Sequence, residues 1–491
     1  MKKIFKIRFI LLFLALTMQF SCSNYLELLP PNGLVREEFW KTKEDVQAVL
    51  MGAYQSFANM NGDLMAYGEA RGDLVTASNS WQWSNEYKLM TSTIVPENDL
   101  CKWEKFYKVI NYCNEVIKNA PEVQKIDPTF NDFQLKSLMA EAVFLRSLSY
   151  FYLVRIFKDV PLVVTPSESD GVDYYLPQTK GEDVLQAVMK DLNEFRPFAT
   201  ERIETVGETK GRASKASFDA LMADISLWNF DYPACIEYSN RIISDINFFL
   251  MPSDKWFGLF YPGNSLESIF EFQFDDKFNQ PNKLYELTNR NAYKYLPSQR
   301  AVEMFALIYA SEKTRGERMS IAKLSEDNYI IWKFSGMAPD GETVRFGHEA
   351  NSCNFIVYRL ADIYLMKAEA LSQLNRFEEA ATMLNTIRER AETGALEIAN
   401  SPVAYEDAIM DERALELAFE GKRWFDLLRM GRRNNFSRKD KLVELIIENV
   451  PSTEKRILSA KLTNPLGWYL PVHKIEMERN KKLVQNPFYT F

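Results

Sequence analysis

The chain has 491 residues, of which 46% are apolar and 26% are charged, and its formal net charge is −8. A chain of this length can bury a large hydrophobic core. Its acidic balance argues against nucleic acid as a partner, because the phosphate backbone is bound through a surplus of clustered lysine and arginine. Only two histidines, His348 and His473, are present. The sequence therefore predicts no metal site, no histidine-based catalytic triad and no cofactor.

The N-terminus has the pattern of a secretory signal peptide over residues 1–21. Four basic residues within the first eight precede a short apolar run, and small Ser21 precedes Cys22. The run is shorter than the roughly 20 apolar residues that a membrane-spanning helix needs. A cysteine at this place resembles the lipobox of bacterial lipoproteins, so we expect residues 1–21 to be removed and Cys22 to be lipidated. The alternative is ordinary cleavage near Ser21, with Cys22 left as a free or paired thiol.

Residues 61–100 form the first long segment without a helical period, and they are the most suggestive of ligand contact. Trp81 and Trp83 lie two residues apart beside Asn79 and Asn85. Aromatic rings present flat apolar faces and amides bond hydroxyl groups, which together suit a sugar ring. The alternative is that both tryptophans cover a hydrophobic cluster beneath the loop.

Arg71 and Asp73 lie just upstream of these tryptophans. They are interpreted either as polar groups of the same site or as a local ion pair. The residues by themselves do not separate these two interpretations.

Helical periodicity dominates most of the chain. Paired amphipathic stripes separated by short turns predict helical hairpins of the tetratricopeptide (TPR) type near residues 103–157, 183–245 and 357–392, followed by C-terminal helices over 403–430. We expect residues 22–491 to form a single domain. Four cysteines lie within it, and they are expected either as buried thiols or as disulfides: Cys101, Cys113, Cys235 and Cys353.

Two further long insertions, residues 246–300 and 325–356, are rich in turn-forming and aromatic residues. Loops of this length inside a compact domain are usually functional. The alternation in "SIFEFQF", residues 268–274, predicts a short β-strand here. Three aromatic residues of these insertions are candidate ligand contacts, although core positions suit them equally well: Tyr293, Tyr295 and Trp332.

The stretch "LELAFEGKRWFDLLRMG", residues 415–431, raises the question of catalysis because Glu416 and Glu420 lie four residues apart. On one helix both carboxylates would approach a sugar from the same side, whereas a glycosidase pair flanks the scissile bond from opposite sides. Arginines stand three residues from each acid, so the stretch is interpreted as a semi-buried ion network of the scaffold. Its charged members are Arg413, Glu416, Glu420, Arg423, Asp426 and Arg429.

Eight segments in order along the chain resemble the SusD/RagB family of nutrient-binding outer-membrane lipoproteins of Bacteroidetes. They are "SCSNYLELLP", "DVQAVLMGAY", "YKVINYCNEVI" with "EAVFLRSLSYFYLVRIFKDVPLV", "GRASKASFDALMADISLW", "ESIFEFQF", "RLADIYLMKAEAL", "ERALELAFEGKRWFDLLR" and the terminal "YLPVHKIEMERNKKLVQNPFY". The resemblance covers nearly the whole chain. His473 and Phe488 stand where proline and glycine are usual in the family, which concerns local turn geometry.

The resemblance implies a mainly α-helical scaffold of TPR-like hairpins with long loop-rich insertions, a few short β-strands and a ligand-binding face formed by loops 61–100, 246–300 and 325–356. It also implies a non-catalytic, lipid-anchored protein of the outer membrane, facing the cell exterior. Such a protein would capture an oligosaccharide and deliver it to a SusC-like TonB-dependent transporter. Peptides are the alternative cargo, and a glycoside hydrolase using Glu416 and Glu420 is the remaining alternative.

Overall fold

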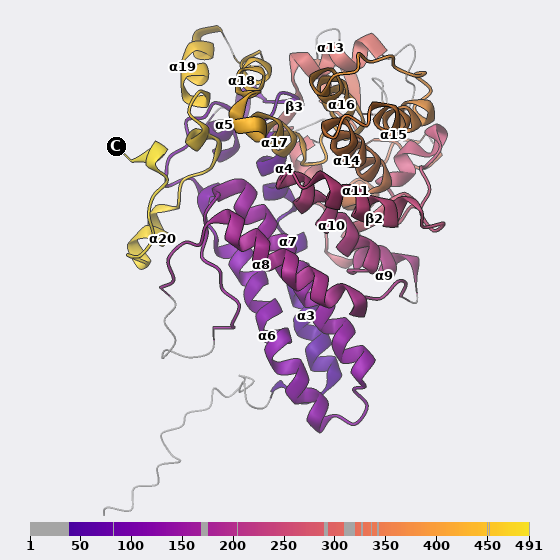
Figure 1. Cartoon of the computed structure of the whole chain (residues 1–491), viewed down its shortest axis with the longest axis vertical. Helices are drawn as coiled ribbons and strands as arrows, with labels where there is room; N and C mark the ends of the chain where they lie inside the picture. The colour runs from indigo at the N-terminus through magenta and orange to yellow at the C-terminus, as the bar shows by residue number, and fades with distance from the viewer. Residues whose placement is uncertain are drawn as a thin grey trace, which may run out of the picture.

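The structure is a computed structural model. It describes residues 39–81, 83–167, 175–203, 205–288, 293–308, 320–325, 328–334, 336–340, 343–448, 450 and 452–490. The predictions of a signal peptide at residues 1–21 and of lipidation at Cys22 fall outside this part of the chain. Within it, the mainly α-helical fold with a few short strands is confirmed (Figure 1).

The helices fall into a first and a second half of the chain. In the first half they are α3 (Lys43–Ala58), α4 (Asn61–Glu69), α5 (Asn85–Met90), α6 (Glu104–Ile126), α7 (Asp132–Phe157), α8 (Gly181–Phe195), α9 (Val206–Gly211), α10 (Lys215–Trp228) and α11 (Tyr232–Ile243). In the second half they are α12 (Leu284–Thr288), α13 (Gln299–Ile308), α14 (Leu360–Gln373), α15 (Phe377–Arg390), α16 (Pro402–Glu416), α17 (Arg423–Phe436), α18 (Lys439–Ile447), α19 (Ser452–Leu462) and α20 (Lys474–Arg479).

The scaffold is a succession of paired helices that pack in chain order. α6 packs on α7, α10 on α11 and α14 on α15, and α11 packs on α14 to join the second pair to the third. Helix α7 is long and apolar enough to cross a membrane, but nearly all of it is buried inside the protein. It is therefore the central core helix, and α3, α6 and α8 pack against it (Figure 1).

Short antiparallel strand pairs connect segments that are far apart in sequence. The strands are β1 (Val75–Ala77), β2 (Ser268–Phe272), β3 (Tyr295–Pro297), β4 (Ile321–Ser325), β5 (Asn328–Ile331) and β6 (Phe355–Arg359). β1 pairs with β3, β2 with β6 and β4 with β5. The strand expected within 268–274 is present as β2, and all five of its residues are buried. Its one acid, Glu271, accepts hydrogen bonds from Ser268 and Asn354, each at 2.7 Å.

The predicted loop 61–100 begins instead with a buried helix, α4. Two glycines hid its helical pattern, and one of them explains why the helix forms at this place. A methyl group on Gly68 would lie 1.8 Å from the carbonyl oxygen of Gly421, so the two backbones are in direct contact. The neighbouring Glu69 accepts hydrogen bonds from the backbone N–H groups of Gly421 and Lys422, at 2.8 and 3.1 Å. The α4 helix is thus docked onto the turn before α17.

The stretch 415–431 is not one continuous helix, and the prediction that it would be is wrong. Helix α16 ends at Glu416, and the chain turns through Phe419 and Gly421, which have φ angles of 64° and 75°, before α17 begins at Arg423. A glycine reaches such an angle without strain. Glu416 and Glu420 therefore do not share a helix face.

Both glutamates instead join a buried cluster of charges, here called the Arg359 network. Arg359 binds Glu267 and Glu416 at 2.7 Å and Glu420 at 2.8 Å. Lys333 binds Glu420 at 2.9 Å, and Arg390 binds Glu267 and Glu416. The ring of Trp256 lies 5.1 to 5.6 Å from the three cationic groups. Burial opposes ionisation of Glu420, but Arg359 and Lys333 outweigh it and lower the pKa of its carboxyl.

The other charged residues of this stretch pair mostly with distant helices, not with their helical neighbours. Arg413 binds Asp426 at 2.8 Å and Asp362 at 2.9 Å, and Arg429 binds Glu369 at 2.6 Å. Of the three expected pairs at a spacing of three residues, Asp426 with Arg429 is present, at 3.0 Å. The scaffold interpretation of the stretch therefore agrees with the structure, whereas most of the partners expected within it were wrong.

The four cysteines of the described domain are buried free thiols: Cys101, Cys113, Cys235 and Cys353. Burial raises the pKa of the Cys113 thiol to about 12. Of the two alternatives left open by the sequence, the structure has the buried thiols.

Substituting Gly68 with alanine is expected to destabilise the protein by about 2 kcal/mol or more, because overpacking forces backbone shifts at the contact with Gly421. The matched control is Gly52→Ala, since Gly52 lies in α3 with open space around the added methyl group. That control should leave stability unchanged or raise it by up to about 1 kcal/mol. Denaturant unfolding would measure both, and equal effects would contradict the contact.

Substituting Glu420 with alanine is expected to cost about 3 to 5 kcal/mol, because it leaves the buried cations Lys333 and Arg359 short of a partner. The control is Glu444→Ala, which breaks an exposed pair with Lys441 and should change stability little. The free energies of unfolding of the two variants provide the comparison. A Glu420 variant as stable as the Glu444 variant would overturn the structural role of the network.

Candidate functional site

The candidate ligand face is formed where β1 pairs with β3. The register places Val75 opposite Pro297 and Ala77 opposite Tyr295. The pairing brings the chain that follows β1 beside the chain that precedes β3, and Ser78 N–H donates a hydrogen bond to the Lys294 carbonyl at 3.0 Å. Strand β5 packs next to β3. Residues from three of the predicted insertions therefore meet at one place, near α5 and β3 in Figure 1.

The two tryptophans of the loop differ in exposure. Trp83 is 89% exposed, the largest value among the exposed large apolar side chains of the described chain. Trp81 is half-buried, and the ammonium group of Lys294 lies 4.3 Å from the centre of its ring. Backbone hydrogen bonds hold Trp81 on both sides, from its N–H to Ser78 and from Ser84 N–H to its carbonyl. The loop is thus anchored at Trp81 and presents Trp83 to solvent.

Around the tryptophans, part of the predicted polar set is already engaged. Asn85 donates a hydrogen bond from its side chain to Asp99 at 3.2 Å and accepts one at its carbonyl from Asn98 at 3.1 Å. It therefore ties α5 to the segment that follows. Tyr293 is half-buried and packs against the core with its ring. The side chain of Asn79 lies outside the part of the structure that is described.

Arg71 and Asp73 lie inside the protein, so the prediction that they contact ligand is corrected. Arg71 is 4% exposed, donates to the Gly467 carbonyl at 2.7 Å and stacks on Trp424 at 4.4 Å. Asp73 is fully buried and binds Arg423. Burial opposes ionisation of Asp73, but Arg423 and Arg300 outweigh it and lower the pKa of this carboxyl.

Tyr295 and Trp332 are also buried, and the prediction of ligand contact is corrected for them as well. They are 1% and 8% exposed. Tyr295 is the strand residue whose side chain points inward, and Trp332 follows β5 with its N–H bonded to the Ser320 carbonyl at 2.8 Å. Each ring fills space between the loops and the helical scaffold.

Lys294 is a member of this face that sequence reasoning missed. Its signal was present, since successive side chains of a strand point to opposite sides and Lys294 stands between two tyrosines. Once Tyr295 is assigned to the core, Lys294 is expected outside, where it reaches Trp81.

The resulting surface combines an exposed indole, a second indole with a cation over its ring, and hydroxyl and carboxylate groups nearby. Ser80 is exposed and Glu86 is half-buried. An aromatic face can stack on the apolar face of a ring, and the polar groups around it can bond hydroxyls. The arrangement has the composition of a binding surface for a polar ligand with apolar faces.

Comparison with family models divides the chain into two matched parts. Residues 228–489 match the model described as "SusD family", and residues 24–227 match the model described as "Starch-binding associating with outer membrane".

Individual relatives agree with this assignment. SusD-like protein P38 of Formosa agariphila is 27% identical over 456 residues, covering 83% of this chain and 88% of the relative. A crystal structure of a SusD superfamily protein from Bacteroides vulgatus matches with a TM-score of 0.76 at 20% identity, covering 92% of this chain and all of the other. A structure described as a laminarin-binding SusD-like protein matches with a TM-score of 0.71 at 21% identity, covering 91% and 99%.

The different burial of the tryptophans is testable by stability. Trp83→Ala should leave the free energy of unfolding almost unchanged, because an exposed ring contributes little to the core. Trp332→Ala is the matched control and should cost about 3 to 5 kcal/mol through the cavity it leaves. Denaturant unfolding would decide, and a large loss of stability in the Trp83 variant would show that this ring is buried.

Proposed function

Because this chain belongs to the SusD/RagB family, we propose that it is a cell-surface binding protein that captures an oligosaccharide. The proposal rests on family membership for the type of activity and on the surface around Trp83 for its location. The laminarin-binding neighbour of the same fold supports a glycan as the class of ligand.

The single observation that carries the proposal is the exposure of Trp83 on an anchored loop. A fully solvated indole is an unfavourable surface unless a partner covers it. Here the ring stands beside Trp81 and Lys294, and the β1–β3 pairing holds the loop in place. A preformed ring loses little conformational entropy when a sugar stacks on it. Stacking by one or two rings also suits a relay, because moderate affinity permits release.

The protein would remain at the membrane through acyl chains on Cys22 and deliver its cargo to a SusC-like TonB-dependent transporter. The motif around Cys22 and the family model that describes association with the outer membrane support this part of the proposal. Two or more acyl chains are sufficient for stable anchoring.

We further propose that the protein catalyses no reaction. Glu416 and Glu420, the acid pair considered for glycoside hydrolysis, are buried and both bind Arg359. A substrate has no access to these carboxylates in this structure, and their ion pairs favour the charged form in both, whereas a general acid must carry a proton.

A glycan array with the chain from Ser23 onward, followed by calorimetric titration of any hit, tests the proposal. Saturable binding should weaken about tenfold or more in Trp83→Ala, since stacking on one aromatic ring contributes on the order of 1 to 3 kcal/mol in related base-stacking sites. The matched control is Trp332→Phe, which keeps an aromatic ring inside the core and should retain the affinity.

Two outcomes would contradict the proposal. Unchanged affinity in Trp83→Ala would remove the site from this loop. A blank glycan array together with binding of a peptide library would replace the oligosaccharide with peptides as the cargo.

A further inference from the structure

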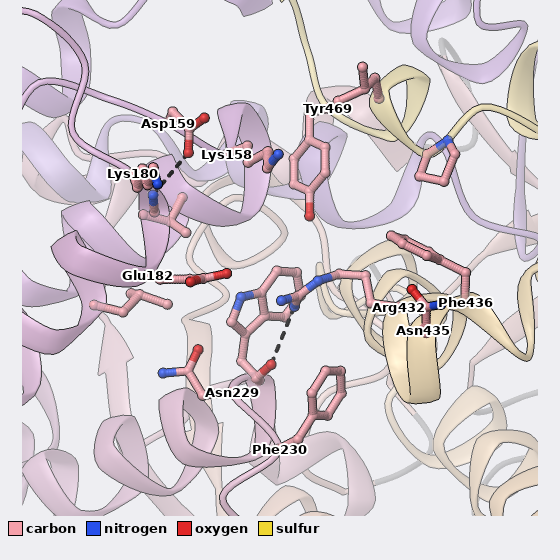
Figure 2. Close-up of a pocket in the computed structure, with 16 residues that line it drawn as sticks. Lys158, Asp159, Lys180, Glu182, Asn229, Phe230, Arg432, Asn435, Phe436 and Tyr469 are labelled. Carbon is pink, nitrogen blue, oxygen red and sulfur yellow. Dashed lines mark hydrogen bonds between the residues drawn. The ribbon is translucent and has the colours of Figure 1, made fainter.

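A second cavity lies in the helical scaffold, away from the loop that carries Trp83. It has a volume of about 530 Å³, within the range of about 300 to 1,000 Å³ that is typical of small-molecule sites. The end of α7, the start of α8, the turn after α10 and the end of α17 surround it, together with residues 465–469 (Figure 2). It shares no lining residue with the surface around Trp83.

The backbone at the rim of this cavity adopts unusual conformations. Lys158 has φ 71° and ψ −72°, and the N–H of Asp159 bonds the carbonyl of Phe157 at 3.0 Å, which together define the rare classic γ-turn. Phe230, Asn435 and Phe436 also line the cavity and have φ angles of 63°, 55° and 65°. Strained non-glycine residues tend to gather at functional sites.

The interior combines aromatic rings with an arginine. The guanidinium of Arg432 lies 4.3 Å from the ring centre of buried Trp228 and donates to the Trp228 carbonyl at 3.3 Å. The hydroxyl of Tyr469 points into the space (Figure 2). The ring of Phe436 is 39% exposed at the rim. These rings offer the apolar faces that a sugar needs.

The polar groups around the rings favour a ligand with negative charge. Lys158, Lys180 and Arg432 contribute three cationic groups, and no ion pair joins either lysine to another residue in the described part of the chain. One of the two acids, Asp159, already accepts a hydrogen bond from the N–H of Gly181 at 2.9 Å. Cations therefore exceed the acids that remain available.

We propose that this cavity is a second binding site, for a sugar unit that carries an acidic group. The apolar faces of the sugar pack on the aromatic lining, and its carboxylate or sulfate lies among Lys158, Lys180 and Arg432. Asn229 and Asn435, both exposed at the rim, supply amides for hydroxyl groups. The inference rests on the proposed function for its class of ligand, but it places recognition of acidic units apart from the Trp83 loop.

The test uses a Trp81→Ala/Trp83→Ala background, so that binding at the loop is removed and the cavity is read alone. Trigalacturonate, a sulfated galactose disaccharide and neutral cellotriose serve as probes in calorimetric titration. At least one of the two acidic probes should bind saturably and cellotriose more weakly. Which acidic probe binds then identifies the group as carboxylate or sulfate.

Lys180→Glu in the same background should weaken binding of the acidic probe about tenfold or more, since the change reverses a charge at the site. Lys190→Glu is the matched control, because Lys190 is an exposed lysine of α8 away from the cavity, and it should bind as the background does. Asn435→Gly removes an amide while accepting the positive φ angle, and it should also weaken binding.

Three results would overturn the proposal: no saturable binding of either acidic probe, equal binding by Lys180→Glu and Lys190→Glu, or cellotriose binding as tightly as the acidic probes. None of them bears on the function proposed for the loop, which is read with Trp81 and Trp83 in place. Loss of binding at the loop in Trp83→Ala would in turn leave the cavity measurement unaffected.

Discussion

The buried network centred on Arg359 is the constraint on which the rest of the structure depends. Three cations and three carboxylates are removed from water together, and each would be costly to bury without its partners. Their segments come from β5, β6, the entry to β2, α15 and the end of α16. Because the charges are satisfied only when all of these segments are in place, the network specifies how the strands dock on the helical pairs.

The turn after α16 carries this constraint to the ligand face. Glu416 and Glu420 stand on either side of it, and Gly421 within it contacts α4 through Gly68. From α4 the chain continues through Asp73, which is held by Arg423, into β1 and the loop of Trp81 and Trp83. A rigid scaffold thus reaches almost to the exposed ring. Preorganisation of this kind lowers the entropic cost of binding a flexible sugar.

The two proposed binding surfaces differ in how the fold produces them. The loop surface depends on a strand pair that joins residues more than 200 positions apart, and its exposed ring is open to large ligands. The cavity between α7, α8, α10 and α17 instead uses helix ends with left-handed backbone, which direct Lys158, Phe230 and Asn435 toward one space. Together they would let one protein contact a long glycan at two chemically different units.

The sequence by itself determined the helical pairs, the buried character of the segment that forms β2, and the role of residues 412–429 as scaffold, because periodicity and charge spacing are local properties. Only the tertiary structure decided which charges pair, since Arg359 and Lys333 are far from Glu420 in sequence. It likewise decided that Trp83 is exposed while Arg71, Asp73, Tyr295 and Trp332 are buried. Exposure depends on which distant segments cover a side chain, and a local pattern carries no record of those neighbours.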